Sequence, residues 1–188
     1  VAYSKKPTME EFMAEWRKLY ESKSGERGIY NVAAAKAQAA KNGRRDADHR
    51  FGTNPCSEII LRPYQFCNLS EVVIREKDTY DTLAEKVRLA TILGTWQATL
   101  TDFKYLRKIW KDNTEEERLL GVSLTGQFGN KLMSGKESLG KLAMDLENLK
   151  DVAIRTNKAE AAIIGIPQSA AITCVKPSGT VSQLVGVS

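Results

Sequence analysis

The sequence predicts an α/β fold in which short buried strands alternate with longer amphipathic helices. Two observations carry this prediction. Apolar residues recur at helical spacing in several segments of a dozen or more residues. Short continuous apolar runs lie between those segments, at 59–61, 119–124 and 170–175. Strands separated by helices of this length are typical of parallel sheets joined by crossover helices.

The first predicted helix starts at Thr8, which forms a capping-box pattern with Glu11, and it ends near Gly25. A second helix, rich in alanine, starts after the N-cap residue Asn31 and ends near 42–43. Its small side chains predict close packing. Trp16 in the first helix, like Trp96 and Trp110 further along, fits a helix face directed at a core.

Residues 44–58 contain several turn formers and predict a loop that enters the interior near Cys56. His49 falls in this loop and is taken as an ordinary loop residue. A buried strand at 59–61 follows. The basic turn 42–45 is either a solvated helix end or a contact to a nucleotide or an acidic surface.

The second half of the chain predicts a long helix at about 79–103 and a helical turn that starts at 114–117. A buried strand at 119–124 leads to a helix at about 136–164, broken once, and then to a strand at 170–175. With no internal repeat, low-complexity tract or linker, we take 1–188 as a single fragment of one domain.

Composition excludes several functional classes. The net charge is +5, from 28 Lys and Arg against 23 Asp and Glu. This suits an anionic ligand or a mixed, solvated surface, but the aromatic residues do not interleave with the basic ones, so a nucleic-acid-binding module is the weaker hypothesis. No apolar run is long enough to span a membrane. Three cysteines without a secretion signal indicate a reducing, cytoplasmic location.

The segment Thr53-Asn54-Pro55-Cys56-Ser57-Glu58 carries the chemistry. In an extended chain residues two apart point to the same side, so the side chains of Asn54, Cys56 and Glu58 would converge. A thiol, an amide that binds hydroxyl groups and a carboxylate base make a plausible site. A buried inert thiol is the plain alternative. Cys56 and Cys67 lack the further ligand pair of a zinc site, so no metal is expected.

A second candidate site follows the last predicted strand, at Lys176-Pro177-Ser178-Gly179-Thr180-Val181-Ser182. Small and hydroxyl-bearing residues after a strand present backbone N–H groups to a phosphate. The order of residues is not that of a Walker motif, and an ordinary turn is the plain alternative. Cys174, on the preceding strand, is taken as a structural thiol.

The pattern Asn-Pro-Cys-Ser-Glu, with Cys-Asn-Leu-Ser-Glu-Val starting 11 residues after its cysteine, resembles the active-site region of class II ribonucleotide reductases. The likeness is greatest to the monomeric, lactobacillus-type triphosphate reductases. It extends over nearly the whole chain, including 41–46, 51–53, 87–95 and 116–123. Those enzymes are several times longer than this chain.

The resemblance implies a place in a ten-stranded α/β barrel, with Cys56 on a central finger loop. Cys56 would be the thiyl radical that takes the 3′ hydrogen of the ribose, Glu58 would take the 3′-hydroxyl proton, and Asn54 would hold the ribose hydroxyls. Cys67 would be one of two reducing thiols. The substrate phosphates would bind the residues Ser178, Gly179, Thr180, Val181 and Ser182.

The implied cofactor is adenosylcobalamin, for which the chain offers no identifiable binding region. The implied partners are a ribonucleoside triphosphate, thioredoxin or a similar dithiol, and nucleotide effectors that bind elsewhere. The second reducing thiol lies upstream in the family, so we expect the fragment alone to be inactive. A reductase of another radical class is the nearest alternative; Pro55 and the short spacing to Cys67 favour the cobalamin type.

Overall fold

The computed structural model describes residues 6–24 and 28–187, and the chain divides into two compact units, 1–32 and 33–188. The first unit contains helix α1 (Met9–Ser22). The predicted capping box is confirmed: Glu11 N donates to Thr8 Oγ1 at 3.2 Å and Thr8 N donates to the Glu11 carboxylate at 2.8 Å. The helix ends at Lys23, whose φ of 46° is left-handed; the predicted stop at Gly25 lies outside the described residues.

No residue of α1 is buried, and the prediction that Trp16 belongs to a core is wrong. Trp16 is 45% exposed and stacks on Phe12, one turn earlier in the same helix. The prediction fails for Trp96 as well: its ring is 53% exposed, and its indole N–H donates to Glu160. Trp110 is half-buried and stacks on Phe66.

Helix α2 (Val32–Ala40) is followed by two short antiparallel strands, β1 (Gly52–Thr53) and β2 (Ile60–Leu61). The close packing predicted for the alanine-rich helix is confirmed, because Ala35 and Ala39 are buried against Phe51. The predicted strand at 59–61 is present, although its residues 60 and 61 are only half-buried.

The main sheet is a parallel pair, β3 (Asn68–Val73) and β4 (Leu120–Thr125), in register from Asn68 opposite Leu120 to Val73 opposite Thr125. Its parallel arrangement confirms the prediction, although β3 itself was not predicted. Segment 170–175 is not a regular strand. It runs beside β4 through three backbone hydrogen bonds and forms a single bridge, Thr173 with Val122.

Helix α3 (Tyr80–Gln97) lies in the connection between β3 and β4. Helix α5 (Leu139–Ile164) is continuous over 26 residues, so the break predicted in this helix is absent. Helix α4 (Lys108–Glu117) ends where a helix was predicted to begin. The short elements η1 (Gln127–Gly129) and α6 (Thr180–Leu184) complete the chain. No helix in the described part is long and apolar enough to cross a membrane.

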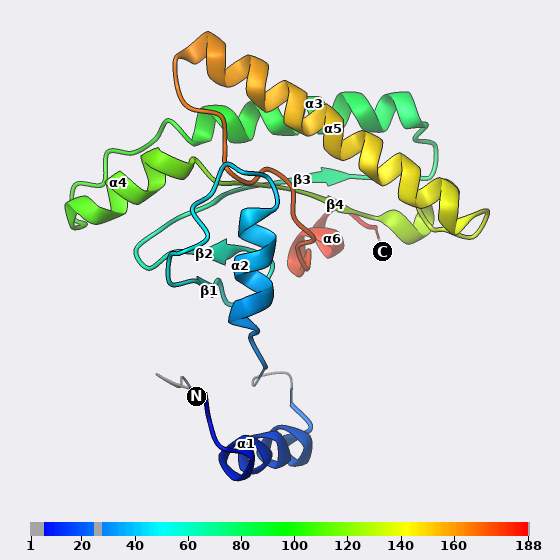
Figure 1. Ribbon diagram of the computed structural model, residues 1–188. Helices are drawn as coiled ribbons and strands as arrows, with labels where there is room; N and C mark the ends of the chain where they lie inside the picture. Colours follow the sequence, from blue (N-terminus) through cyan, green and yellow to red (C-terminus); the bar gives the residue numbers. More distant parts are fainter. Residues whose placement is uncertain (1–5, 25–27, 188) are drawn as a thin grey trace. The chain divides into compact units, whose positions relative to one another are not determined.

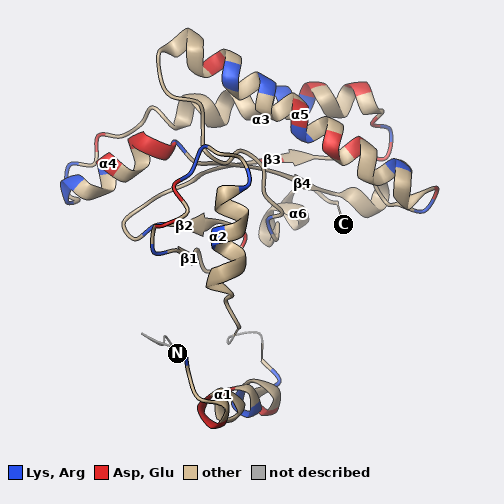
Figure 2. Ribbon diagram, in the orientation of Figure 1, with Lys and Arg blue, Asp and Glu red and all other residues tan. Residues whose placement is uncertain are grey.

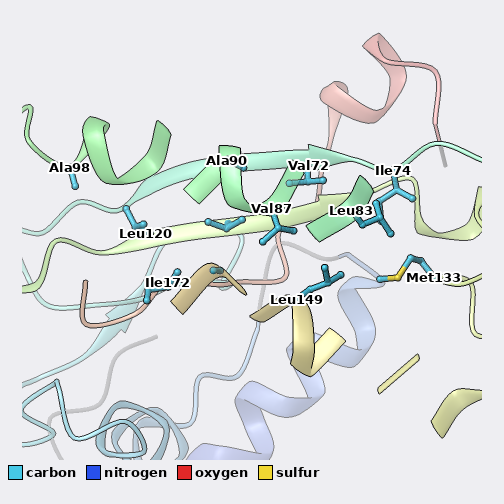
Figure 3. Close-up of a cluster of buried hydrophobic side chains, with 12 residues drawn as sticks. Val72, Ile74, Leu83, Val87, Ala90, Ala98, Leu120, Met133, Leu149 and Ile172 are labelled. Atoms are coloured by element: carbon cyan, nitrogen blue, oxygen red, sulfur yellow. The ribbon is translucent and has the colours of Figure 1, made fainter. Parts of the chain in front are cut away.

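Within the second unit, α3 and α5 cover one face of the β3–β4 pair, and α2, β1 and β2 lie on the other side (Figure 1). The hydrophobic core fills the space between the helices and the sheet (Figure 3). Its buried side chains are Val72, Ile74, Leu83, Val87, Ala90, Ala98, Leu120, Val122, Met133, Leu149, Ala153 and Ile172. The face of the sheet turned away from this core is where the candidate site lies.

Candidate active site

A buried ion network fixes the two ends of the loop that carries the cysteine motif. Arg45 donates two hydrogen bonds to Glu117, at 2.9 and 2.8 Å, and both side chains are at most 4% exposed. Arg62 approaches Glu117 to 3.0 Å and donates to Glu116 at 2.8 Å, while Gln65 also donates to Glu117. Of the two interpretations of the basic turn, a solvated helix end is therefore wrong at Arg45, whose guanidinium is buried and paired with Glu117.

Residues 54–59 form a compact turn, so the extended backbone expected around Cys56 is not observed. Asn54 Oδ1 accepts from Ile59 N at 3.1 Å, and Ser57 N donates to Asn54 O at 3.0 Å. Ser57 has a left-handed φ of 65°. As a result Cys56 is exposed, whereas the side chain of Glu58 is 2% exposed. The chain thus presents the thiol outward and the carboxylate inward.

Glu58 points into a buried site that also receives the cysteines from two other segments. Among the described residues, neither of its carboxylate oxygens has a hydrogen-bond partner, and the cation Lys176 Nζ is 3.6 Å from Oε1. Cys67, just before β3, and Cys174 lie within electrostatic range of this carboxylate. A buried carboxylate with open acceptor positions is suited to accept a hydrogen bond or a proton from a ligand.

Gly121 on β4 leaves the space that the Cys174 thiol occupies. A Cβ atom at this position would lie 2.5 Å from a methyl carbon of Leu69 and 3.1 Å from Cys174 Sγ. Any larger residue here would push Leu69 or Cys174 out of place. Ile59, the neighbour of Glu58 in the sequence, also approaches this glycine, so that three segments meet β4 here.

The thiols of this site have raised pKa values. Burial raises the pKa of Cys67, and the negative charge of Glu58 adds to the effect. Burial, again with a contribution from Glu58, raises the pKa of Cys174 to about 12. Both shifts favour the protonated thiol over the thiolate.

These differences predict the order in which the cysteines react. With iodoacetamide at pH 8 we expect Cys56 to be labelled first, because it is exposed while the other two cysteines are half-buried. Cys174 should be labelled last, because the thiolate is the nucleophile and the pKa of Cys174 is raised to about 12. As the pH is raised, the alkylation rate of Cys67 should increase at a lower pH than that of Cys174. Peptide mass spectrometry over time measures the rates, and labelling in denaturant, where the three should react alike, is the control. Faster labelling of Cys174 than of Cys56 would contradict the structure.

The predicted phosphate loop is anchored to both strands of the sheet. Lys176 N donates to Ser123 Oγ at 3.1 Å, and Ser178 Oγ donates to Glu71 at 3.0 Å. Gly179 has a φ of 58°, a conformation that favours glycine. Within the loop, the Val181 N–H is already bonded to Ser178 O.

A cavity of about 560 Å³ adjoins the far end of this loop. It lies beyond the carboxyl ends of β3 and β4, where open α/β sheets bind ligands. Its lining includes Ser182 from the loop, together with Arg75 and Gly126. Ser182 is the member of the predicted loop that reaches a cavity.

The structure therefore brings Glu58, Cys67 and the start of the phosphate loop together, and it leaves Cys56 and Asn54 at the rim. Sequence reasoning missed Lys176 and Glu71 as partners of these residues. Their signal was present, since Lys176 directly precedes the loop and Glu71 belongs to the second cysteine motif. The contacts themselves depend on the parallel register of the sheet.

Comparison with known proteins gives a consistent result. A scan against models of protein families finds no match. The adenosylcobalamin-dependent ribonucleoside-triphosphate reductase of Lacticaseibacillus paracasei is 30% identical along 89% of this chain and 25% of its own length. The enzyme of the same name from Lactobacillus acidophilus is 33% identical along 73% of this chain and 21% of its own. The chain thus spans about a quarter of the length of these relatives.

A solved structure of a B12-dependent, class II ribonucleotide reductase superposes on this chain with a TM-score of 0.57 and 25% identity. The match covers 73% of this chain and 22% of the reductase. Sequence and structure therefore relate this chain to one segment of class II ribonucleotide reductases. The resemblance drawn from the two cysteine motifs is confirmed.

Proposed function

We propose that this chain is a catalytic segment of an adenosylcobalamin-dependent ribonucleoside-triphosphate reductase, homologous to about a quarter of such an enzyme. In the whole enzyme it would form part of a ten-stranded α/β barrel, with the Cys56 turn as the central finger loop. The observation that carries the proposal is the buried carboxylate of Glu58, which ends the first cysteine motif, has no hydrogen-bond partner on either oxygen among the described residues, and lies within electrostatic range of Cys67 of the second motif.

Cys56 is proposed to carry the thiyl radical that removes the 3′ hydrogen of the ribose and later returns it. Its exposure on a tight turn supports this role, because both the substrate and the source of the radical must reach the sulfur. Breaking an unactivated carbon–hydrogen bond calls for a radical, and adenosylcobalamin would supply that chemistry when bound.

Glu58 is proposed to take the proton of the 3′-hydroxyl while the 2′-hydroxyl leaves as water. Its open oxygens support this role, since a base must meet the hydroxyl directly. Asn54 would orient the ribose. Because its Oδ1 accepts from Ile59 N, the amide group left for a ribose hydroxyl is its NH₂ donor.

Cys67 is proposed to supply electrons together with a thiol from another part of the enzyme. The two thiols would give two electrons and two protons, which replace the 2′-hydroxyl by hydrogen and release water, and a disulfide would remain. A thioredoxin-like dithiol would then reduce this disulfide. The raised pKa of Cys67, caused by burial and by Glu58, supports a thiol that keeps its proton until it reacts.

Residues Ser178 to Ser182 are proposed to hold the substrate phosphates. Ser182 lines the cavity beyond the sheet, and Gly179 allows the turn. Nucleotide effectors would bind outside this segment, and the enzyme would work in the cytoplasm. Figure 2 shows Lys and Arg interspersed with Asp and Glu along α4 and α5, which does not favour the alternative of a nucleic-acid-binding module.

The proposal predicts deoxynucleotide formation that depends on adenosylcobalamin. The protein at its full encoded length should convert CTP to dCTP when adenosylcobalamin and dithiothreitol are present, as measured by chromatography of the nucleotides. Omission of the cofactor should abolish the product. Turnover that ignores cobalamin but needs another radical source would assign a different reductase class, and a folded protein inactive with every source would refute the reductase function.

A further inference from the structure

We propose that Lys176 is a positioning residue of this site, which holds the Glu58 carboxylate in place through its positive charge and connects it to the phosphate loop. The inference rests on the proposed function. It adds a residue that neither cysteine motif contains, and it assigns to the loop a task besides phosphate binding.

The first step is the environment of Glu58. In the described part of the chain, the groups that interact electrostatically at this site are Glu58, Lys176, the thiols of Cys67 and Cys174, and the carboxylate of Glu71. Lys176 carries the positive charge among them. A buried carboxylate without a counter-ion is costly, so it either turns away or takes up a proton.

The second step is the way in which Lys176 is held. Its backbone N–H donates to Ser123 Oγ on β4, and two residues later Ser178 is bonded to Glu71 on β3. The side chain is 26% exposed and reaches from this anchored backbone to Glu58, which belongs to the other loop. At 3.6 Å the pair is close enough for a strong charge interaction in a buried place, yet both Glu58 oxygens stay open for a substrate hydroxyl.

The third step follows from this connection. A ligand that draws the phosphate loop towards itself moves the anchored backbone of Lys176, and through it the charge beside Glu58. Glu58 would then be ready to accept a proton only when the loop is correctly seated. Lys176 acts on the reaction through Glu58 and need not touch the substrate.

Steady-state kinetics of the full-length enzyme with adenosylcobalamin test this role. Lys176→Met should lower kcat about ten- to a hundredfold, part of what a general base contributes, and leave KM for CTP within about twofold. Lys176→Arg, which keeps the charge, should restore most of kcat. Lys108→Met, which removes an exposed lysine paired with Asp112 on α4, is the matched control and should change neither constant.

Two results would overturn the proposal. A higher KM with unchanged kcat would mean that Lys176 binds the phosphates rather than serving Glu58. Equal losses in the Met and Arg variants, accompanied by a lower unfolding midpoint, would mean that the residue only stabilises the fold.

A cofactor-free measurement separates this proposal from the proposed function. The ammonium of Lys176 opposes the rise in the pKa of Cys67, which burial and Glu58 cause. Lys176→Met should therefore slow the alkylation of Cys67 at fixed pH, relative to Cys56, and Lys176→Arg should not. If the wild-type enzyme shows no turnover, the reductase function fails, and this labelling still tests whether Lys176 places its charge in the site that Cys67 and Glu58 share. Unchanged labelling of Cys67 would overturn the role of Lys176 even in an active enzyme.

Discussion

Cys56→Ser is expected to abolish deoxynucleotide formation, with kcat reduced at least about 10³-fold, since every tenfold corresponds to about 1.4 kcal/mol of barrier. An oxygen–hydrogen bond is much stronger than a sulfur–hydrogen bond, so serine does not form the radical that the thiol forms. The exchange is otherwise mild, because Cys56 is exposed and serine is close to cysteine in size. Chromatographic assay of dCTP from CTP gives the result.

Cys174→Ala is the matched control, because it removes a thiol that the reaction does not use. It should keep activity within a few-fold of the wild type. Both variants should show wild-type far-ultraviolet circular dichroism. Retained turnover in Cys56→Ser, or an equal loss in the two variants, would contradict the assignment of the radical to Cys56.

The sequence was sufficient to predict the residues of the site but not their arrangement. The two cysteine motifs identify Cys56, Glu58 and Cys67 by type and spacing, and the roles of these residues remain predictions. The extended backbone expected at 54–58 is replaced by a turn, because Asn54 closes the loop with its own side chain. The Lys176–Glu58 pair joins residues 118 positions apart and depends on the sheet register, which no local pattern encodes.

In the fold, too, the features that depend on local sequence were predicted, whereas those that depend on contacts between distant segments were not. Periodicity was enough to locate α3 and α5, and the box of Thr8 and Glu11 fixed the start of α1. Strand β3 was missed because both of its faces are covered and each carries polar groups: Ser70 lies near Gly94 of α3, and Glu71 faces the loop. The sequence of β3 therefore shows neither a continuous apolar run nor a regular alternation of apolar and polar residues, the two patterns that predict a strand.

The acidic residues 115–117 led to the wrong prediction that a helix begins at 114–117. Acidic side chains favour the first turn of a helix, yet here they end α4. The unfavourable interaction with the helix dipole is offset because Arg45 and Arg62 bind these carboxylates from another part of the chain. The preference of acidic residues for the start of a helix is thus outweighed by the buried ion network. The second prediction with a large expected effect concerns this network.

Glu117→Ala is expected to lower the free energy of unfolding by about 3–5 kcal/mol, the usual cost of leaving a buried charge without its partner. The carboxylate is 2% exposed, accepts hydrogen bonds from Arg45 and Gln65, and forms an ion pair with Arg62 at 3.0 Å, so its loss leaves two guanidinium groups short of a counter-ion. Urea denaturation followed by circular dichroism measures the change.

Glu116→Ala is the matched control, since Glu116 binds the same Arg62 but its side chain is 61% exposed. Its removal should cost less than about 1 kcal/mol, as for other solvent-exposed pairs. The hydrogen bonds from Arg62 hold the pKa of Glu116 below its usual range, so this small contribution is present above the unfolded-state pKa and is lost as the pH falls. Equal destabilisation by the two variants would contradict the network. Because Arg45 and Arg62 flank residues 46–61, Glu117→Ala should also loosen the turn that presents Cys56, and faster alkylation of the half-buried Cys67 would report that loosening.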